Sequence, residues 1–374
     1  MKGHAMKVRD AATALEALAR TAAAEEWDNV GLLIGDADAR LKTLMLCIDL
    51  TAEVLAEARE HKAEMVMAYH PVIFKPLSRL TAETATVAWA AARAGLAVFS
   101  LHTALDVAAG GTNDALAESI GLSDLRPLRP ISGDGLCKVV VFTQPAEAET
   151  VARAAFDAGA GWIGNYSRCA FTSAGEGQFH GEAGSKPAVG RAGQTERTQE
   201  LRIEITAPLA AAGRVAKAIR QAHSYEEPVV DVYPLAGPTG LTPRAGMGRV
   251  GRLARRASIE TLLRRAKRAA GVRRALVARP PDDPGPIEVA ACAAGSAGSL
   301  WKDARAAGAQ LYLTGEMRHH DALAAAAAGL TVVCLGHSNS ERPALARVAE
   351  HLAAEMPKLN VLQSQADRDP FEIE

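Results

Sequence analysis

Histidines that are followed four residues later by a carboxylate are the first feature of this sequence that could do chemistry. Ten histidines and 43 acidic residues in a chain of 374 would produce about one such pair by chance. The chain has four: His102/Asp106, His223/Glu227, His337/Glu341 and His351/Glu355. The last pair lies in ALARVAEHLAAEM, whose spacing predicts an amphipathic helix with a solvated polar face. Context must distinguish among the other three.

Three histidines also share one position relative to the predicted strands. His70 follows EMVMAY, His102 follows LAVFSL, and His337 lies just past TVVCL. Open α/β sheets bind ligands in the crevice at the carboxyl ends of their strands, and imidazole is the commonest metal ligand. Asp106 and Glu341 would add oxygen donors there, a donor set that suits zinc, manganese, iron or cobalt. Each histidine taken alone is better explained as a hydrogen-bonded loop residue, whereas three at equivalent strand ends, two of them followed by a carboxylate, favour a metal site.

Two further stretches hold polar residues beside predicted strands. LTGEMRHHDA (313–322) places Glu316 and His320 after the strand QLYLT, where they could orient ligands or act as a general base. A helix start with acidic residues near its N-terminus explains the same spacing. WDNVGLLIGD (27–36), with Asp28 and Asn29, is a further candidate site or a strand with a tight turn.

The order of elements along the chain indicates a covered α/β sheet. Residues 10–130 alternate helices with short apolar strands, and the same alternation resumes after about residue 250. Between them, residues 137–236 form a small module of strands and helices, bounded by loop-like stretches at 127–135 and 236–248 that contain Pro and Gly. The residues alone leave open whether the two chain ends form one domain around an insertion or three domains follow in series.

The composition predicts an ordinary globular protein of the cytoplasm. Apolar residues make up 48% and charged residues 23% of the chain, and the net charge is −1, which favours neither nucleic acid nor membrane. The five cysteines form no CxxC pair, so buried reduced thiols are the simplest interpretation. No apolar run is long enough to predict a membrane span.

Several longer motifs together resemble a known family. In order they are EEWDNVGLLIGD, YHPVIFKPLSRLT, SLHTALDVAAGGTNDALAE, LYLTGEMRHHDAL and GHSNSERPAL. They resemble the GTP cyclohydrolase 1 type 2 homologues, also described as Nif3-like dinuclear-metal-centre hexameric proteins. The segment with GAGWIGNYSRCAF and HSYEEPVVDVYPL resembles the module inserted in longer members. The resemblance implies a two-lobed Nif3-like α/β domain formed by residues 1–133 and 240–374, with an inserted ferredoxin-like α+β (PII/CutA-like) domain at 137–236.

The same resemblance implies a metal centre and an assembly. The family carries two divalent ions (zinc, iron or manganese), whose ligands would fall on His70, His102, Asp106, His337 and Glu341. Tyr69 stands where many members have a second histidine, so one of the two metal sites could be weak or empty. The pair His223/Glu227 belongs to the inserted module and has no ligand role in the family. Members typically form homohexameric toroids.

Three functions compete at this stage. The first is a metal-dependent hydrolase that acts on a nucleotide, with GTP as the candidate and with Glu316 or His320 moving the proton. The second is a non-catalytic metal-binding or regulatory assembly in which the inserted module binds a small ligand. The third is a phosphoesterase that uses the same two-metal centre.

Overall fold

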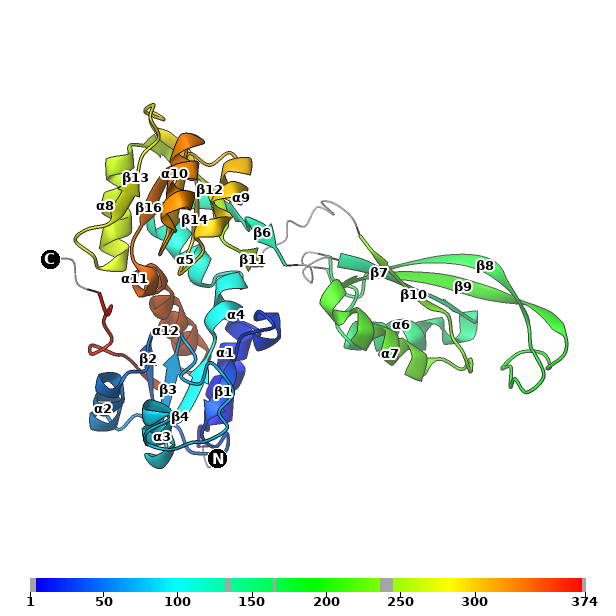
Figure 1. Cartoon of the computed structure of the whole chain (residues 1–374). Helices are drawn as coiled ribbons and strands as arrows, with labels where there is room; N and C mark the ends of the chain where they lie inside the picture. Colours follow the sequence, from blue (N-terminus) through cyan, green and yellow to red (C-terminus); the bar gives the residue numbers. More distant parts are fainter. Residues whose placement is uncertain (1–4, 132–135, 164–165, 236–244, 372–374) are drawn as a thin grey trace. The chain divides into compact units, whose positions relative to one another are not determined.

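The chain divides into two compact units in a computed structural model of residues 1–374. The structure describes residues 5–131, 136–163, 166–235 and 245–371. One unit combines Met1–Ile131 with Arg244–Glu374, and the other is Ser132–Pro243. The discontinuous unit thus contains both ends of the chain (Figure 1). The junctions expected near residues 133–137 and 236–240 fall largely on 132–135 and 236–244, which lie outside the described residues.

The first lobe of the discontinuous unit is a five-stranded sheet in the order β1-β4-β3-β2-β17. Its strands are β1 (Gly31–Ile34), β2 (Thr43–Cys47), β3 (Met65–Ala68), β4 (Ala97–Ser100) and β17 (Asn360–Gln363). Only β1 runs antiparallel to its neighbour. Every residue of β3 and β4 is buried, because helices cover both faces of a parallel sheet.

Helices from both chain ends cover this sheet. They are α1 (Val8–Leu18), α2 (Ala52–Glu60), α3 (Thr86–Arg93) and α12 (Pro343–Glu355). Residues of α1 and α12 share one hydrophobic cluster with one face of the sheet, and residues of α2 and α3 pack on the other face. α2 begins after Thr51, whose side chain accepts a hydrogen bond from the Val54 amide at 3.3 Å.

The second lobe is a six-stranded sheet in the order β13-β16-β15-β14-β12-β5. Its strands are β5 (Leu122–Arg126), β12 (Arg249–Ala257), β13 (Leu276–Ala278), β14 (Ile287–Ala293), β15 (Leu311–Thr314) and β16 (Thr331–Cys334). The three strands β14, β15 and β16 are parallel. α5 (Thr112–Ser119) and α8 (Ile259–Ala270) cover one face, while α9 (Trp301–Ala306) and α10 (His319–Ala327) cover the other.

Two short helices begin close to the strand ends that matter for the site. α4 (His102–Val107) follows β4, and α11 (His337–Glu341) follows β16. A two-stranded ribbon of β6 (Arg129–Pro130) and β11 (Gly246–Met247) completes this unit. The mixed α/β class expected from the sequence is therefore confirmed. Among the described residues, no helix combines the length and the apolar character that crossing a bilayer requires.

The second unit is an antiparallel sheet covered on one face by two helices. Its elements follow as β7 (Leu136–Thr143), α6 (Ala148–Asp157), β8 (Ala170–His180), β9 (Thr195–Pro208), α7 (Ala212–Ala222) and β10 (Val230–Pro234). The sheet order is β10-β7-β9-β8, and every pair is antiparallel. Alternate residues of β7 and β9 pack with α6 and α7 in a hydrophobic core of this unit's own.

The buried side chain of Arg249, on β12 of the second lobe, holds the C-terminal end of α4. The side chain of Arg249 is 1% exposed, and its Nη2 lies 2.6 Å from the Asp114 carboxylate. The same guanidinium donates to the Gly246, Gly248 and Ala108 carbonyls at 2.6, 2.8 and 2.7 Å. Because Ala108 ends α4, this arginine positions the helix that carries His102 and Asp106.

We expect Arg249→Met to destabilise the protein by roughly 3–5 kcal/mol, because a buried carboxylate and three carbonyls lose their partner. Arg252→Met is the matched control on the same strand, since Arg252 is 60% exposed and pairs with Glu288 at the surface. Its effect should stay below about 1 kcal/mol. Thermal unfolding of the full chain measures both, and equal effects of the two substitutions would contradict this role for Arg249.

Candidate metal centre

The candidate centre lies between the carboxyl ends of parallel strands from both lobes of the discontinuous unit. His70 follows β3, His102 begins α4 directly after β4, and His337 and Glu341 are the ends of α11 after β16. Ring centroids lie 5.2 Å apart for His70 and His102 and 5.4 Å apart for His70 and His337. The three histidines that the sequence places at strand ends therefore meet in one cluster.

Glu341 is the centre of this cluster. Its side chain is 4% exposed, and its two oxygens lie 3.3 Å from His70 Nε2 and 3.3 Å from His337 Nε2. Oε2 is buried and accepts no hydrogen bond from the described residues, because the approach of His70 lacks hydrogen-bond geometry. His70, His337 and Glu341 offer ligand atoms that all lie within 4.8 Å of one another. An orphaned carboxylate oxygen between two imidazoles fits a divalent cation.

A glycine keeps the space beside Glu341 clear. Gly295 has φ +66°, and a Cβ built on it would lie 2.6 Å from Glu341 Oε1 and 3.5 Å from His337 Nε2. The Gly295 amide donates a hydrogen bond to Ser340 Oγ at 2.8 Å. Any larger residue at position 295 would enter the volume where the ligand atoms converge.

Two aspartates orient the imidazoles from behind. Asp49 Oδ1 lies 2.8 Å from His70 Nδ1, and Asp28 Oδ1 lies 2.7 Å from His102 Nδ1. In each pair the carboxylate engages Nδ1 and leaves Nε2 available, which is the usual arrangement behind metal-ligating histidines. His102 has φ +35°, a conformation that a residue with a side chain rarely adopts. Asp28 also accepts from the Thr103 amide at 3.2 Å, which helps to hold this backbone.

Asp106 lies beside the cluster and is shared with Tyr69. The Tyr69 hydroxyl donates to Asp106 Oδ1 and lies 3.2 Å from Thr112 Oγ1. Burial and the nearby Asp106 and Glu341 charges raise the pKa of the Tyr69 phenol well above its ordinary value. Tyr69 is consequently a neutral hydrogen-bond donor that positions Asp106. Burial and the Glu341 charge raise the pKa of Asp106 to about 7.

The cluster favours positive charge. Burial lowers the pKa of His70, but the hydrogen bond to Asp49 and the nearby Glu341 and Asp49 charges outweigh it and raise that pKa to about 10. The hydrogen bond to Glu341 is the main reason that the pKa of His337 rises to about 9. Burial opposes ionisation of Glu341, yet the two imidazoles lower its pKa overall. Cations, whether protons or metal ions, thus stabilise this site.

The two residues considered for proton transfer occupy different surroundings. Glu316 Oε2 lies 3.4 Å from His337 Nδ1, at the edge of the cluster. His320 is exposed at the start of α10, and its described ring contact is with His319 at 5.4 Å between centroids. Within the described residues, no hydrogen bond, ion pair or ring contact joins His320 to the cluster.

Sequence reasoning missed Asp49 and gave Asp28 no role. Asp49 lies two residues past the end of β2, a position at a strand end like that of His70 after β3. Asp28 lies in WDNVGLLIGD (27–36), which the sequence indicates only as a separate candidate site. Nothing in the linear spacing pairs residue 28 with residue 102 or residue 49 with residue 70. Those pairings exist only because β1, β2, β3 and β4 are members of one sheet.

Comparisons with known proteins agree over nearly the whole chain. A family model described as Duf34/NIF3 (NGG1p interacting factor 3) matches residues 6–370. A protein named GTP cyclohydrolase 1 type 2 homolog from Halalkalibacterium halodurans is 34% identical, covering 98% of this chain and 99% of the relative. One of the same name from Bacillus subtilis is 33% identical, with 93% of each covered. The crystal structure of a Bacillus cereus protein related to NIF3 matches with a TM-score of 0.79 at 32% identity, covering 100% of both chains.

The raised imidazole pKa values predict how stability depends on pH in chelator-treated protein. Protonation of His337 and His70 stabilises the fold fully below their ordinary pKa of 6.5 and is lost as pH rises through about 9 and about 10. We therefore expect the melting temperature to fall between pH 6.5 and about 10. Glu341→Gln should make the fall shallower, whereas the exposed Glu350→Gln should keep the wild-type slope. A Glu341→Gln slope equal to that of wild type would refute this assignment.

Proposed function

The chain belongs to the Duf34/NIF3 family, and we propose that it is a divalent-metal-dependent hydrolase that acts on a nucleotide, with GTP as the first candidate. The observation that supports the metal is the buried Glu341 carboxylate, whose oxygens lie 3.3 Å from His70 Nε2 and His337 Nε2 and whose Oε2 accepts no hydrogen bond within the described residues. The nucleotide is suggested by the name of the relatives, GTP cyclohydrolase 1 type 2 homolog.

We assign the ligands of two ions to the clustered residues. His70, His337 and Glu341 would hold the first ion, and the adjacent His102 and Asp106 would contribute to a second. Tyr69 donates to one Asp106 oxygen, so the tyrosine would position a ligand without being one. Nitrogen and oxygen donors without sulfur are compatible with zinc, iron or manganese.

The residues around the ligands supply the remaining chemistry. A bound divalent ion lowers the pKa of a water molecule and stabilises negative charge that develops on the substrate. Asp49 and Asp28 keep the imidazoles oriented, so no reorganisation is needed during the reaction. Glu316, beside His337, would accept and return the proton, and His320 is the alternative proton carrier. For a cyclohydrolase, C8 of the guanine ring leaves as formate as two water molecules are consumed.

We extend the proposal to the assembly and to the inserted unit. The β-α-β-β-α-β order with the sheet order β10-β7-β9-β8 supports a ferredoxin-like unit of the PII/CutA type. A homohexamer is proposed from the family resemblance. A regulatory, non-catalytic assembly is the second candidate function, and the observation that favours it is a cavity lined wholly by residues of the inserted unit.

Metal content tests the ligand assignment directly. We expect Glu341→Gln to weaken the metal affinity by at least about tenfold, because the buried charge is lost. The metal bound per chain should fall accordingly. Gly295→Ala should also lower it, because the new Cβ would meet Glu341 Oε1. Glu350→Gln is the exposed control. Elemental analysis after dialysis measures all four proteins, and unchanged metal in Glu341→Gln would remove the proposed centre.

Formate release tests the reaction. Protein loaded with zinc, iron or manganese should release formate from GTP, and Glu316→Gln should lower kcat by about 100-fold with its metal content retained. His320→Gln is the comparison. If only this variant loses kcat, the proton carrier is His320 and not Glu316. Release of phosphate without formate would replace the cyclohydrolase with a phosphoesterase. No turnover with any of the three metals would favour the regulatory candidate.

A further inference from the structure

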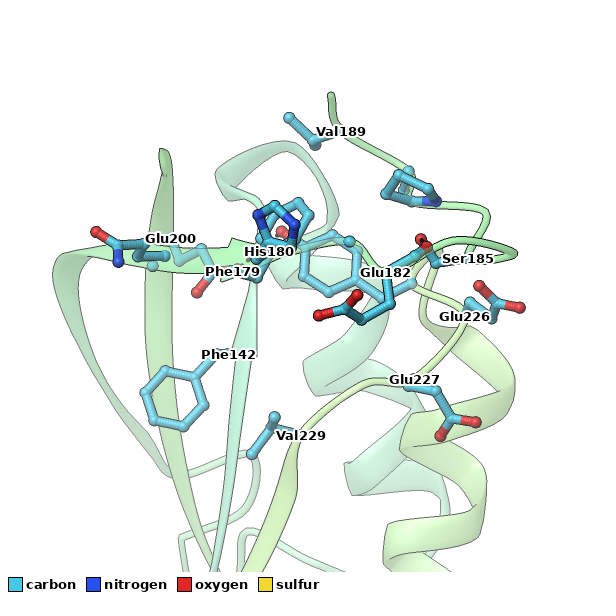
Figure 2. A pocket seen from close by; sticks show the side chains of 16 residues that line it. Phe142, Phe179, His180, Glu182, Ser185, Val189, Glu200, Glu226, Glu227 and Val229 are labelled. Atoms are coloured by element: carbon cyan, nitrogen blue, oxygen red, sulfur yellow. Dashed lines mark hydrogen bonds between the residues drawn. The ribbon is translucent and has the colours of Figure 1, made fainter. Parts of the chain in front are cut away.

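The inserted unit contains a cavity of its own. It has a volume of about 430 Å³, within the range of small-molecule sites. It lies between the end of the β8–β9 hairpin and the segment that leads into β10 (Figure 2). Its apolar lining includes Phe142, Phe179, Pro187, Val189 and Val229.

The charged side chains that line this cavity are mainly acidic. Glu182, Glu200, Glu226 and Glu227 line it together with His180, and none of its lining residues is Lys or Arg. The Arg202 guanidinium lies over the Phe142 ring, 5.5 Å from its centroid, and pairs with Glu204. The excess of carboxylates in the lining disfavours nucleotides, phosphates and carboxylic acids. The same charges attract a cationic ligand, and the apolar walls require that ligand to carry a hydrophobic body.

The four carboxylates differ in whether they accept hydrogen bonds from neighbouring residues. Glu226 accepts from the Lys186 amide at 2.8 Å, and Glu200 accepts from the Tyr225 hydroxyl at 2.8 Å. Within the described residues, neither the Glu182 nor the Glu227 carboxylate takes part in a hydrogen bond or an ion pair. In Figure 2 the Glu182 carboxylate points toward the middle of the lining residues, whereas that of Glu227 points away from them. Glu182 is therefore the free carboxylate that faces a ligand.

Neighbouring residues hold the Glu200 side chain in place. Its carboxylate lies over Gly177, where an added Cβ would stand 2.3 Å from Oε2. Tyr225, which donates to Glu200, is held by His223, whose Nδ1 accepts from the Tyr225 amide at 3.0 Å. His223 Nε2 then donates to the Phe142 carbonyl at 2.9 Å, which fixes the neutral tautomer. The pair His223/Glu227 is thus explained: the histidine is a buried structural residue and the glutamate lies at the cavity.

A single metal ion does not fit this arrangement. Among the described residues, the group of His, Cys, Asp and Glu whose ligand atoms lie within 4.8 Å of one another is His70, His337 and Glu341, and no such group occurs at this cavity. Its carboxylates are spread around an apolar floor, which matches charges separated by a hydrocarbon chain. We propose that the inserted unit binds an organic cation with an apolar body, an alkyl diamine or a related amine, with Glu182 and Glu200 receiving the ammonium groups.

Calorimetry with the full chain and one carbon skeleton tests this proposal. The probes are hexane-1,6-diamine, hexylamine, hexan-1-ol and adipate at low ionic strength. We expect affinity to fall in that order, with the alcohol about tenfold or more weaker than the diamine and no adipate binding. Glu182→Gln and Glu200→Gln should each weaken diamine binding about five- to tenfold. Glu149→Gln, an exposed residue of α6 paired with Arg153 outside the cavity, is the matched control.

Each contrary result has a distinct meaning. Equal binding of alcohol and diamine would show that the carboxylates do not contribute and would overturn the proposal. Displacement of the diamine by equimolar zinc or magnesium would identify a metal site instead. An absence of diamine binding, with the two variants folded normally by circular dichroism, would also overturn it and leave a basic side chain of a second copy as the occupant. None of these results depends on GTP turnover, so this proposal and the hydrolase proposal fail separately.

Discussion

The buried carboxylate of Glu341 is the constraint on which the candidate centre depends. Removing an ionised carboxylate from water costs several kcal/mol unless cations and hydrogen bonds replace the lost hydration. The structure supplies His70 from one lobe and His337 from the other, each 3.3 Å from a Glu341 oxygen. The two lobes must therefore keep a fixed relation for this charge to be tolerated, and the raised imidazole pKa values are the electrostatic consequence.

Several buried polar contacts maintain that relation between the lobes. Asn113 donates to the Asp106 carbonyl at 2.8 Å and accepts from the Ala294 amide at 2.8 Å, and it is only 1% exposed. Arg249 holds the end of α4 from the other side. Glycine at position 295 lets the second lobe approach Glu341 closely. Much of the polar structure around the site thus serves to place a few ligand atoms within reach of one another.

The two units carry opposite chemical preferences. The histidine cluster, with a bound cation, would attract an anionic substrate such as a nucleotide. The cavity of the inserted unit is lined by four glutamates and by no Lys or Arg, and it would disfavour the same molecule. A ligand of the inserted unit would consequently be chemically unrelated to the substrate. Such separation is what a regulatory input requires, because the substrate could not compete for the second site.

The fold class and the positions of the three histidines follow from the order of residues alone. Short apolar strands alternating with helices predict a covered sheet, and His70, His102 and His337 stand where those strands end. This succeeded because burial on both faces produces uninterrupted apolar runs, so the strand ends can be read directly. The long motifs also determined the family, because they retain their order over both ends of the chain.

The part that each residue plays in the site depends on the packing of distant segments. Tyr69 could be a ligand or a replacement until its burial and its contact with Asp106 made it a neutral donor. Asp49 and Asp28 acquired partners through strand pairing, and Glu316 was separated from His320 by its contact with His337. The physical reason is that burial, desolvation and hydrogen-bond partners are set by residues distant in sequence. Local spacing can identify a polar side chain at a strand end, but it carries no information about those distant neighbours.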